Sequence, residues 1–272
     1  AGGVETDACS GDIFKHHHAA LLAEYFEAEG MPLCPACSSR DSRRAGALAD
    51  TRTKDVPMMD LLQCPMCDIH GFLLTGRKAS EQDVALPSRS KDTVLDYSYA
   101  LAEPATWAES SQISIRRGNV DIGDPMIMRS SCRSGAYALC VRYKCAAVGV
   151  DTYMWQPLIE EERRMERHRC VLRALRDQIL SPDGARTGRM LPHVTDIRGA
   201  IMLRTRIGRA YMCSPLRSDF VEQLERTASI ASDVSMVLRF EQWEEFAARM
   251  EFLIAHSLPC CPRKQALPLL GN

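Results

Sequence analysis

Four cysteines form two short, similar motifs, Cys34-Pro-Ala-Cys37 and Cys64-Pro-Met-Cys67, with 26 residues between them. A CxxC turn places two sulfur atoms on one side of a tight loop, and two such turns can form the tetrahedral four-sulfur site that suits Zn²⁺. Because thiolates would fill all four coordination positions, the predicted zinc ion is structural. The intervening segment is polar and rich in arginine, so we expect metal binding to supply the free energy that folds it.

Two other uses of these cysteines remain open, a redox-active CxxC and a pair of disulfides. A redox motif of the thioredoxin type needs one CxxC at the start of a helix that follows a strand, which two copies in polar loops do not match. The spacer is longer than the ~15–20 residues of common two-knuckle zinc sites. His70 follows Cys67 by three residues and is an alternative ligand. The other eight cysteines show no such spacing and are expected to be mostly small buried apolar residues.

Arginine is concentrated in the second half of the chain. Between Arg163 and Arg217 there are 13 arginines and four acidic residues, a local charge of +9. Residues 218–252 hold eight acidic residues and three arginines, a local charge of −5. A polyanion would bind the first tract, and the acidic helices could meet a basic surface of a neighbouring copy. Six of these arginines are expected on the solvent-exposed face of one helix, namely Arg163, Arg164, Arg167, Arg169, Arg173 and Arg176.

Three short basic segments are candidates for contact with phosphate. In the loop Gly184-Ala-Arg186-Thr187-Gly188-Arg189, glycines allow close approach of the backbone, and the arginines and threonine can bond phosphate oxygens. The loop lacks the GK[ST] ending of a Walker motif. The second segment, Arg129-Ser-Ser-Cys-Arg133-Ser134, leads into a predicted strand. The third, Lys15-His16-His17-His18, lies on the first predicted helix. Adjacent histidines on a helix point about 100° apart and cannot converge on one metal, so phosphate or 2′-OH contacts are the expected use.

The hydrophobic pattern predicts an α+β fold. Helices are expected over residues 12–29, with Ser10 as the N-cap, and over residues 158–180, 217–231 and 241–256. Strands are expected at residues 69–74, 135–150, 197–206 and 235–240, and residues 96–102 and 112–118 are expected to form a projecting hairpin. In the 135–150 strand, apolar residues alternate with a second face that holds Ala138, Cys140, Arg142, Lys144 and Ala146.

The length and composition exclude several classes of protein. With 272 residues and 46% apolar content, the chain can bury a core without disulfide staples. Its apolar runs are too short for a membrane span, and its first residues do not resemble a secretory signal, so we expect a cytoplasmic protein. The net charge of −1 argues against electrostatic binding of nucleic acid over the whole surface and leaves only a local basic site. Motifs such as HExxH, GxSxG, GxGxxG and the P-loop do not occur, which favours a protein that is not an enzyme.

Four segments occur in the order seen in one family. They are GDIFKHHHAALLAE, CPMCDIHGFLL, PMIMRSSCRSGAYALCV and DGARTGRMLPH, and together they span residues 10–215. This set resembles the DevR-type backbone subunit, a repeat-associated (RAMP) protein that polymerises along guide RNA in type I CRISPR Cascade complexes. The resemblance implies a modified RNA-recognition (ferredoxin-like) palm, a finger-like insertion that holds the zinc knuckles, and a thumb hairpin near residues 86–125.

The resemblance also implies a domain plan and a set of partners. Residues 1–33 would begin the palm, 34–68 form the zinc-knuckle insertion, 69–128 the finger and thumb region, 129–259 the rest of the palm and 260–272 an extended tail. The family's palm begins with a strand, which residues 1–9 do not clearly supply. The implied partners are guide RNA (crRNA), target DNA through the guide, other copies of the chain and other Cascade subunits.

The resemblance places three groups of residues at the RNA. Near the first helix these are Lys15, His16 and His18; at the palm, Arg129, Arg133 and Ser134; on the glycine loop, Arg186, Thr187 and Arg189. The predicted function is non-catalytic binding of guide RNA. Two alternatives remain, a type III-like subunit that cuts target RNA with an acid such as Asp12 or Asp124, and a zinc-stabilised enzyme.

Overall fold

The computed structural model describes residues 5–48, 50–51, 54–75, 86–116, 126–182, 194–204, 211–231 and 233–259. Four helices of more than two turns form the frame: α1 (Gly11–Ala28), α6 (Glu161–Leu180), α7 (Phe220–Ile230) and α8 (Trp243–His256). All four lie where the hydrophobic pattern predicts helices. The predicted N-cap of α1 is confirmed, since the Ser10 hydroxyl accepts a hydrogen bond from the Asp12 backbone N–H.

Shorter helices carry the cysteine motifs and the turns around them. They are α2 (Pro35–Ser38), η1 (Arg44–Ala47), α4 (Met58–Leu61), α5 (Pro65–His70) and, later in the chain, η2 (Cys145–Ala147).

The strands are short and pair antiparallel. They are β1 (Ala8–Cys9), β2 (Phe72–Leu74), β3 (Arg89–Lys91), β4 (Leu95–Tyr97), β5 (Ala100–Ala102), β6 (Ala108–Arg116), β7 (Met126–Ser134), β8 (Tyr137–Ala138), β9 (Val141–Tyr143), β10 (Val150–Asp151), β11 (Gln156–Pro157), β12 (Gly199–Arg204) and β13 (Val234–Phe240). The described strands form a three-stranded sheet, β1-β5-β8, and the pairs β2-β3, β4-β9, β6-β7, β10-β11 and β12-β13. The α+β class is confirmed, but the described strands do not form one continuous sheet of the RNA-recognition type.

The β4-β9 pair and the β5-β8 pair follow one another and together form one long two-stranded ribbon. The backbone bond from Ser98 N–H to the Cys140 carbonyl joins the β4-β9 pair to the β5-β8 pair. The predicted strand 135–150 is therefore correct in position but is interrupted around Leu139–Cys140 and ends at η2. Residues 96–102 pair with this strand and not with residues 112–118, which corrects the predicted hairpin.

A strand before the first helix is present. Residues Ala8 and Cys9 form β1, which pairs antiparallel with Leu101 and Ala100 of β5. The segment is too short for a hydrophobic alternation to be recognised in the sequence, which is why residues 1–9 give no clear strand pattern.

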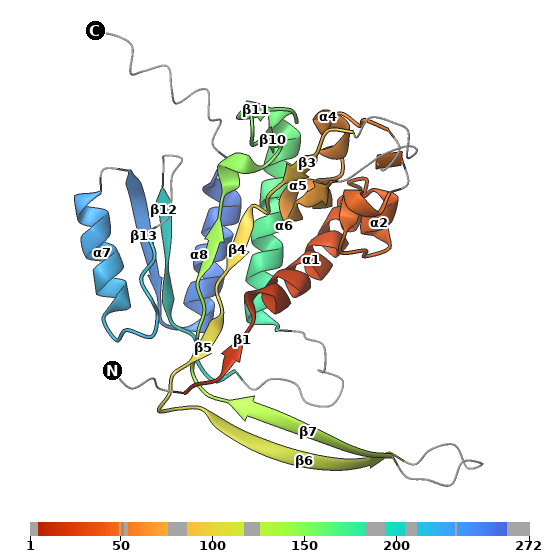
Figure 1. Cartoon of the computed structure of the whole chain (residues 1–272). Coiled ribbons are helices and arrows are strands. Elements are labelled where there is room, and N and C mark those ends of the chain that lie inside the picture. Colours follow the sequence, from red (N-terminus) through yellow and green to blue (C-terminus); the bar gives the residue numbers. More distant parts are fainter. Residues whose placement is uncertain are drawn as a thin grey trace.

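The projecting hairpin consists of β6 and β7, which pair over nine residues each from Ala108–Ser134 at the base to Arg116–Met126 at the far end. Figure 1 shows it extending away from the body of the molecule below α1. Residues 129–134 therefore belong to this hairpin, not to the palm, while β3, β4 and β5 of the expected thumb region lie in the body.

The core consists of two apolar clusters that share α6. The larger joins α1, α5, α6 and β4, with Leu22, Phe26, Ile69, Leu95 and Val171 fully buried. The smaller joins α6, α8 and β13. In Figure 1, α7 and α8 flank the β12-β13 pair on opposite sides. Among the described residues, no helix has both the length and the apolar character needed to cross a membrane.

Candidate metal centre and nucleic-acid interface

The two cysteine motifs are built in the same way. Cys34 and Cys64 occupy the N-cap positions of α2 and α5, and the proline that follows each is the first helical residue. Proline suits this position because the first helical N–H has no partner within the helix and because its φ angle is already helical. The second cysteine of each motif then lies in the first turn, and its sulfur atom returns to the side of the first.

The four sulfur atoms form a compact cluster in which every pair lies within 4.8 Å. Cys67 Sγ lies 3.8 Å from Cys34 Sγ and 3.6 Å from Cys37 Sγ. A tetrahedron with Zn–S bonds of about 2.3 Å has edges of about 3.8 Å, so this spacing fits a four-thiolate metal site. The Cys34 backbone N–H also points to Cys64 Sγ at 3.3 Å, a contact that stabilises a thiolate. The four cysteines could hold a metal ion.

The cysteine segment is part of the main core, which corrects the expected separate insertion. Cys37, Leu62, Cys64, Cys67 and Ile69 all belong to the larger apolar cluster. Each short helix of this segment contributes one to three apolar side chains to the cluster. Together these side chains pack against α1 and α6 although the segment as a whole is polar.

A buried ion cluster lies directly beside the second cysteine motif. Asp68 is fully buried, and its carboxylate lies 2.6 Å from Lys91 Nζ and 2.8 Å from Arg167 Nη1. It also accepts the backbone N–H of Gly149, a residue with φ +68° where a Cβ would meet Arg164 and Ile159. A buried charge needs this degree of compensation.

Two helix arginines that were expected to face solvent are buried. Arg167 donates to the Leu62 and Gln63 carbonyls as well as to Asp68, and Arg164 donates to the Val148 carbonyl. The pattern of charges on a helix gives no sign that a neighbouring segment will offer carbonyl groups and a carboxylate to one of its faces.

His18 does not face a ligand, which corrects its expected place at the RNA. Its side chain is fully buried, with Nδ1 3.0 Å from His70 Nε2 and Nε2 3.3 Å from the Val171 carbonyl. Burial lowers the pKa of His18 to about 4, so the ring is neutral. Because Nε2–H donates to Val171, Nδ1 accepts the proton of His70 Nε2. The pair therefore joins α1 to α5 and α6.

The neighbouring residues of α1 do reach the surface. His16 is exposed, His17 is half-buried, and their rings lie 5.7 Å apart. Lys15 is half-buried, and both burial and the nearby Arg44 lower its pKa. Its position next to a second cation indicates a site that favours an anion.

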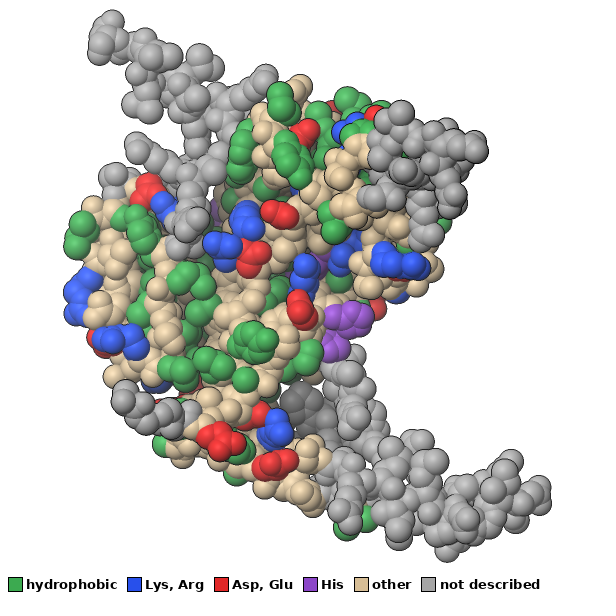
Figure 2. Space-filling model, in the orientation of Figure 1, with side chains coloured by type: hydrophobic (Ala, Val, Ile, Leu, Met, Phe, Trp, Pro, Cys, Tyr) green, Lys and Arg blue, Asp and Glu red, His purple; other side chains and the backbone are tan. Residues whose placement is uncertain are grey.

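Three cations lie around one carboxylate beside α1, and a fourth, Arg44, lies next to one of the three. Asp96 lies opposite Arg142 in the β4-β9 pair and accepts from Arg142 Nε at 2.7 Å, while Lys144 Nζ lies 3.0 Å away. Lys15 from α1 interacts electrostatically with Arg44, Lys144 and Asp96. We call Lys15, Arg44, Arg142, Lys144 and Asp96 the cationic cluster. Figure 2 shows basic, acidic and histidine side chains gathered across the middle of this face, above the projecting hairpin.

Sequence reasoning found only Lys15 of this cluster. Arg142 and Lys144 gave a usable signal, since they are the two charged residues on one face of an otherwise apolar strand. Asp96 and Arg44 gave none, because only the pairing of β4 with β9 and the turn of η1 bring them there. Arg44 adopts φ +53° in this turn and bonds the carbonyl of Ser42.

The predicted palm residues lie on the hairpin. Arg133 and Ser134 are exposed on β7 at the hairpin base, and Arg129 pairs with Ile113 farther along the same strand. Arg133 forms an ion pair with Asp7, whose carboxylate also accepts from Tyr137 OH at 2.6 Å. These bonds attach the hairpin to the segment before β1. Arg186, Thr187 and Arg189 lie outside the described residues.

The basic tract is partly neutralised within the molecule. Arg173 pairs with Glu29, Arg176 with Asp177 and Glu251, and Arg204 with Asp233. Together with the buried Arg164 and Arg167, these pairs reduce the expected basic surface. The remaining basic side chains of the described residues lie in the cationic cluster and at scattered positions, and Arg186, Arg189, Arg206 and Arg209 of the tract lie outside the described residues.

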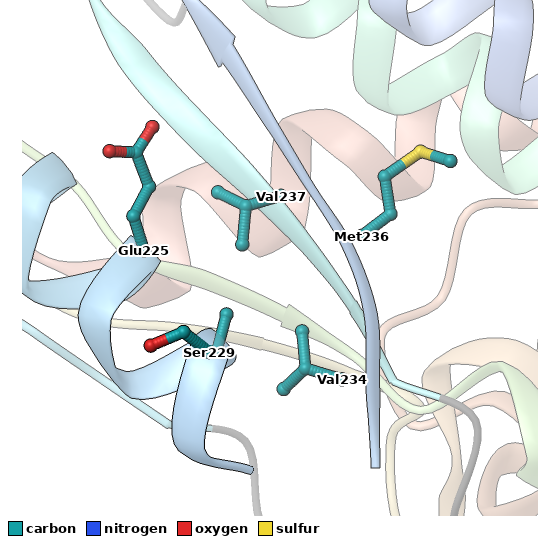
Figure 3. A pocket seen from close by; sticks show the side chains of 6 residues that line it. Glu225, Ser229, Val234, Met236 and Val237 are labelled. Carbon is teal, nitrogen blue, oxygen red and sulfur yellow. The ribbon is translucent and has the colours of Figure 1, made fainter. Parts of the chain in front are cut away.

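Three features of the described residues bear on the alternative that the chain is an enzyme. A shallow hollow between α7 and β13 is lined by Glu225, Ala228, Ser229, Val234, Met236 and Val237, and the Ser229 hydroxyl donates to the Arg226 carbonyl (Figure 3). In the chain Tyr143–His168–Ser257, the serine hydroxyl donates to the Leu253 carbonyl, so His168 is not a base for it. Asp12 is exposed in the first turn of α1, where an acid stabilises the helix.

Comparison with known proteins identifies the family. The model for the family described as CRISPR-associated negative auto-regulator DevR/Csa2 matches residues 2–223. The chain belongs to the DevR/Csa2 family. No curated protein matches the sequence closely enough to count as a relative. The DevR/Csa2 match covers β1, the cysteine motifs, the projecting hairpin and the cationic cluster, and it ends within α7.

Proposed function

We propose that this DevR/Csa2 chain binds guide RNA by its sugar–phosphate backbone, without cutting it, as the backbone subunit of a type I CRISPR effector complex. The cationic cluster carries this proposal. It sets Lys15, Arg142 and Lys144 around a single carboxylate on a partly exposed strand pair, with Arg44 next to Lys15. Such a surface attracts a polyanion, and contacts to phosphates position a strand without reading its sequence.

Two further features support this role. The hairpin β6-β7 projects from the body next to α1, where it could fold over a strand that crosses the cluster. Aromatic residues make up only 6% of the chain, which favours a strand held by its phosphates over one held by stacked bases. Copies arranged along one guide would leave its bases free to pair with target DNA, and further Cascade subunits would complete the complex.

We also propose that Cys34, Cys37, Cys64 and Cys67 bind one structural Zn²⁺. The sulfur spacing supports it, and four thiolates leave no open position for a substrate or water. When bound, the ion would cross-link α2 to α5, and it would take part in no chemical step.

The decisive experiment measures binding of a labelled single-stranded RNA by fluorescence anisotropy over a range of salt concentrations. Lys15→Ala with Lys144→Ala leaves the Arg142–Asp96 pair intact and is expected to weaken binding and to reduce the slope of log K against log salt by about 1.4. The matched control is Arg217→Ala with Arg226→Ala, two exposed cations near α7. Equal retention of RNA by wild type and by the Lys15/Lys144 variant at every salt concentration would contradict the proposal.

Two added samples test the remaining features of the proposed function. A second RNA of equal length and unrelated sequence is expected to bind with similar affinity, since phosphates carry no sequence information. Incubation with complementary RNA and Mg²⁺ is expected to leave both strands intact. Cuts at regular intervals would instead support the type III-like alternative.

A further inference from the structure

Asp96 is an unusual residue to find in an RNA-binding surface, because a carboxylate repels phosphate. It lies directly opposite Arg142 in the β4-β9 register, and a single oxygen, Oδ2, faces both Arg142 and Lys144. About one third of each of these three side chains is exposed, so solvent and ligands can reach them. The cluster therefore contains its own anion at the point where a phosphate would bind two cations.

The charge state of Asp96 is secure at neutral pH. Partial burial raises the pKa of its carboxyl, but hydrogen bonds from Arg142 and Lys144 outweigh burial and keep the pKa below its ordinary value. The other groups of the cluster are cations, Lys15 and Arg44 among them. An incoming phosphate must then compete with a permanently ionised carboxylate for Arg142 and Lys144.

We propose that Asp96 is a built-in counter-ion that makes the cationic cluster selective for a strand of linked phosphates over a single phosphate group. This inference rests on the proposed function. A lone phosphate gains too little to displace Asp96 from its two cations. A strand places several phosphates on the surface at once, and each contact raises the effective concentration of the next. Asp96 thereby holds Arg142 and Lys144 in position in the free protein and excludes nucleotides and inorganic phosphate.

The test compares wild type with Asp96→Asn, which keeps an oxygen acceptor for Arg142 and removes the charge. The variant is expected to bind single-stranded RNA at least fivefold more tightly at low salt, with a log–log salt slope steeper by about 0.7, the value for one additional phosphate contact. Inorganic phosphate alone is expected to bind the variant more tightly than wild type, and by a larger factor than RNA does. Asp96→Ser, a second neutral variant, must give the same changes, and Asp96→Glu must keep the wild-type slope.

The matched control is Asp219→Asn, which removes an exposed carboxylate that faces two arginines outside the cluster. It is expected to change neither the slope nor the phosphate sensitivity. If wild type binds RNA but the neutral Asp96 variants bind it no more tightly and with the same slope, the role of Asp96 is refuted and the proposed function stands. If wild type does not bind RNA, both proposals fall.

Discussion

The role of a single residue in this protein depends on the partners that the fold brings next to it. Asp68 illustrates this, because its side chain lies next to Cys67 in sequence yet is compensated by Lys91 of β3 and Arg167 of α6. The three charges are almost completely inaccessible to solvent. They connect the second cysteine motif to a strand and to the central helix, so this cluster helps to position the four cysteines.

Removing the charge of Asp68, the one anion of this cluster, should strongly destabilise the folded protein. Asp68→Asn leaves Lys91 and Arg167 buried with no carboxylate, and we expect the free energy of unfolding in urea to fall by about 3–5 kcal/mol. Asp55→Asn, which breaks an exposed pair with Arg89, is expected to cost less than about 1 kcal/mol. Equal unfolding midpoints for the two variants would show that the buried cluster contributes no more than a surface pair.

At the scale of elements, the cysteine segment is part of the core, whereas the hairpin projects away from it. The cysteine helices α2 and α5 contribute Cys37, Cys67 and Ile69 to the main apolar cluster. Hairpin β6-β7 contributes no residue that is described as part of either cluster, and its described side chains are mostly exposed. A substitution in the cysteine segment should therefore destabilise the whole protein, whereas hairpin β6-β7 should be dispensable for folding.

Loss of the metal should destabilise the whole protein. We expect purified protein to contain one zinc per chain by elemental analysis, and Cys64→Ser or a strong chelator to lower the melting temperature of the entire chain. Cys140→Ser changes a partly exposed cysteine outside the four and should leave the melting curve unchanged. A protein that contains no zinc, or a Cys64→Ser variant that melts like wild type, would contradict the proposed metal site.

The hairpin should be removable. A Cβ built on Gly135 would lie 2.9 Å from Trp107 Cα, so the two ends of the hairpin are already adjacent. Replacing residues 108–134 by two glycines is expected to change the melting temperature by only a few degrees while weakening RNA binding. A deletion variant that fails to fold would show that the Asp7–Arg133 attachment contributes to the core.

At the scale of the whole molecule, buried histidines link elements that are far apart in the chain. Tyr143 of β9 bonds His168 of α6 at 2.8 Å, and His168 bonds Ser257 after α8 at 2.7 Å. Burial, together with the nearby Arg169 and Arg164, lowers the pKa of His168 to about 4. The ring is therefore neutral in the folded protein.

This histidine makes stability depend on pH. Above pH 6.5 it is neutral in both the folded and unfolded chain, and below that value the unfolded chain alone takes up a proton until the pH approaches 4. The free energy of unfolding should therefore fall by up to about 1.4 kcal/mol per pH unit between pH 6.5 and 4 because of this group alone. His168→Asn keeps an acceptor near Nδ1 for Tyr143 and should reduce the slope of unfolding free energy against pH by about one proton. An unchanged slope in urea titrations at several pH values would assign the proton uptake elsewhere, with His18 as the next candidate.

The positions of α1, α6, α7 and α8, the α+β class and the four-cysteine site follow from the sequence, because helix periodicity, caps and CxxC spacing are local properties. Local patterns cannot show which distant groups meet. Only the tertiary structure buries His18 against His70 and Arg167 against Asp68, and only the pairing of β4 with β9 sets Asp96 between Arg142 and Lys144. The charge of each residue is given by its type, but its burial and its partners decide whether that charge holds the core together or stays at the surface.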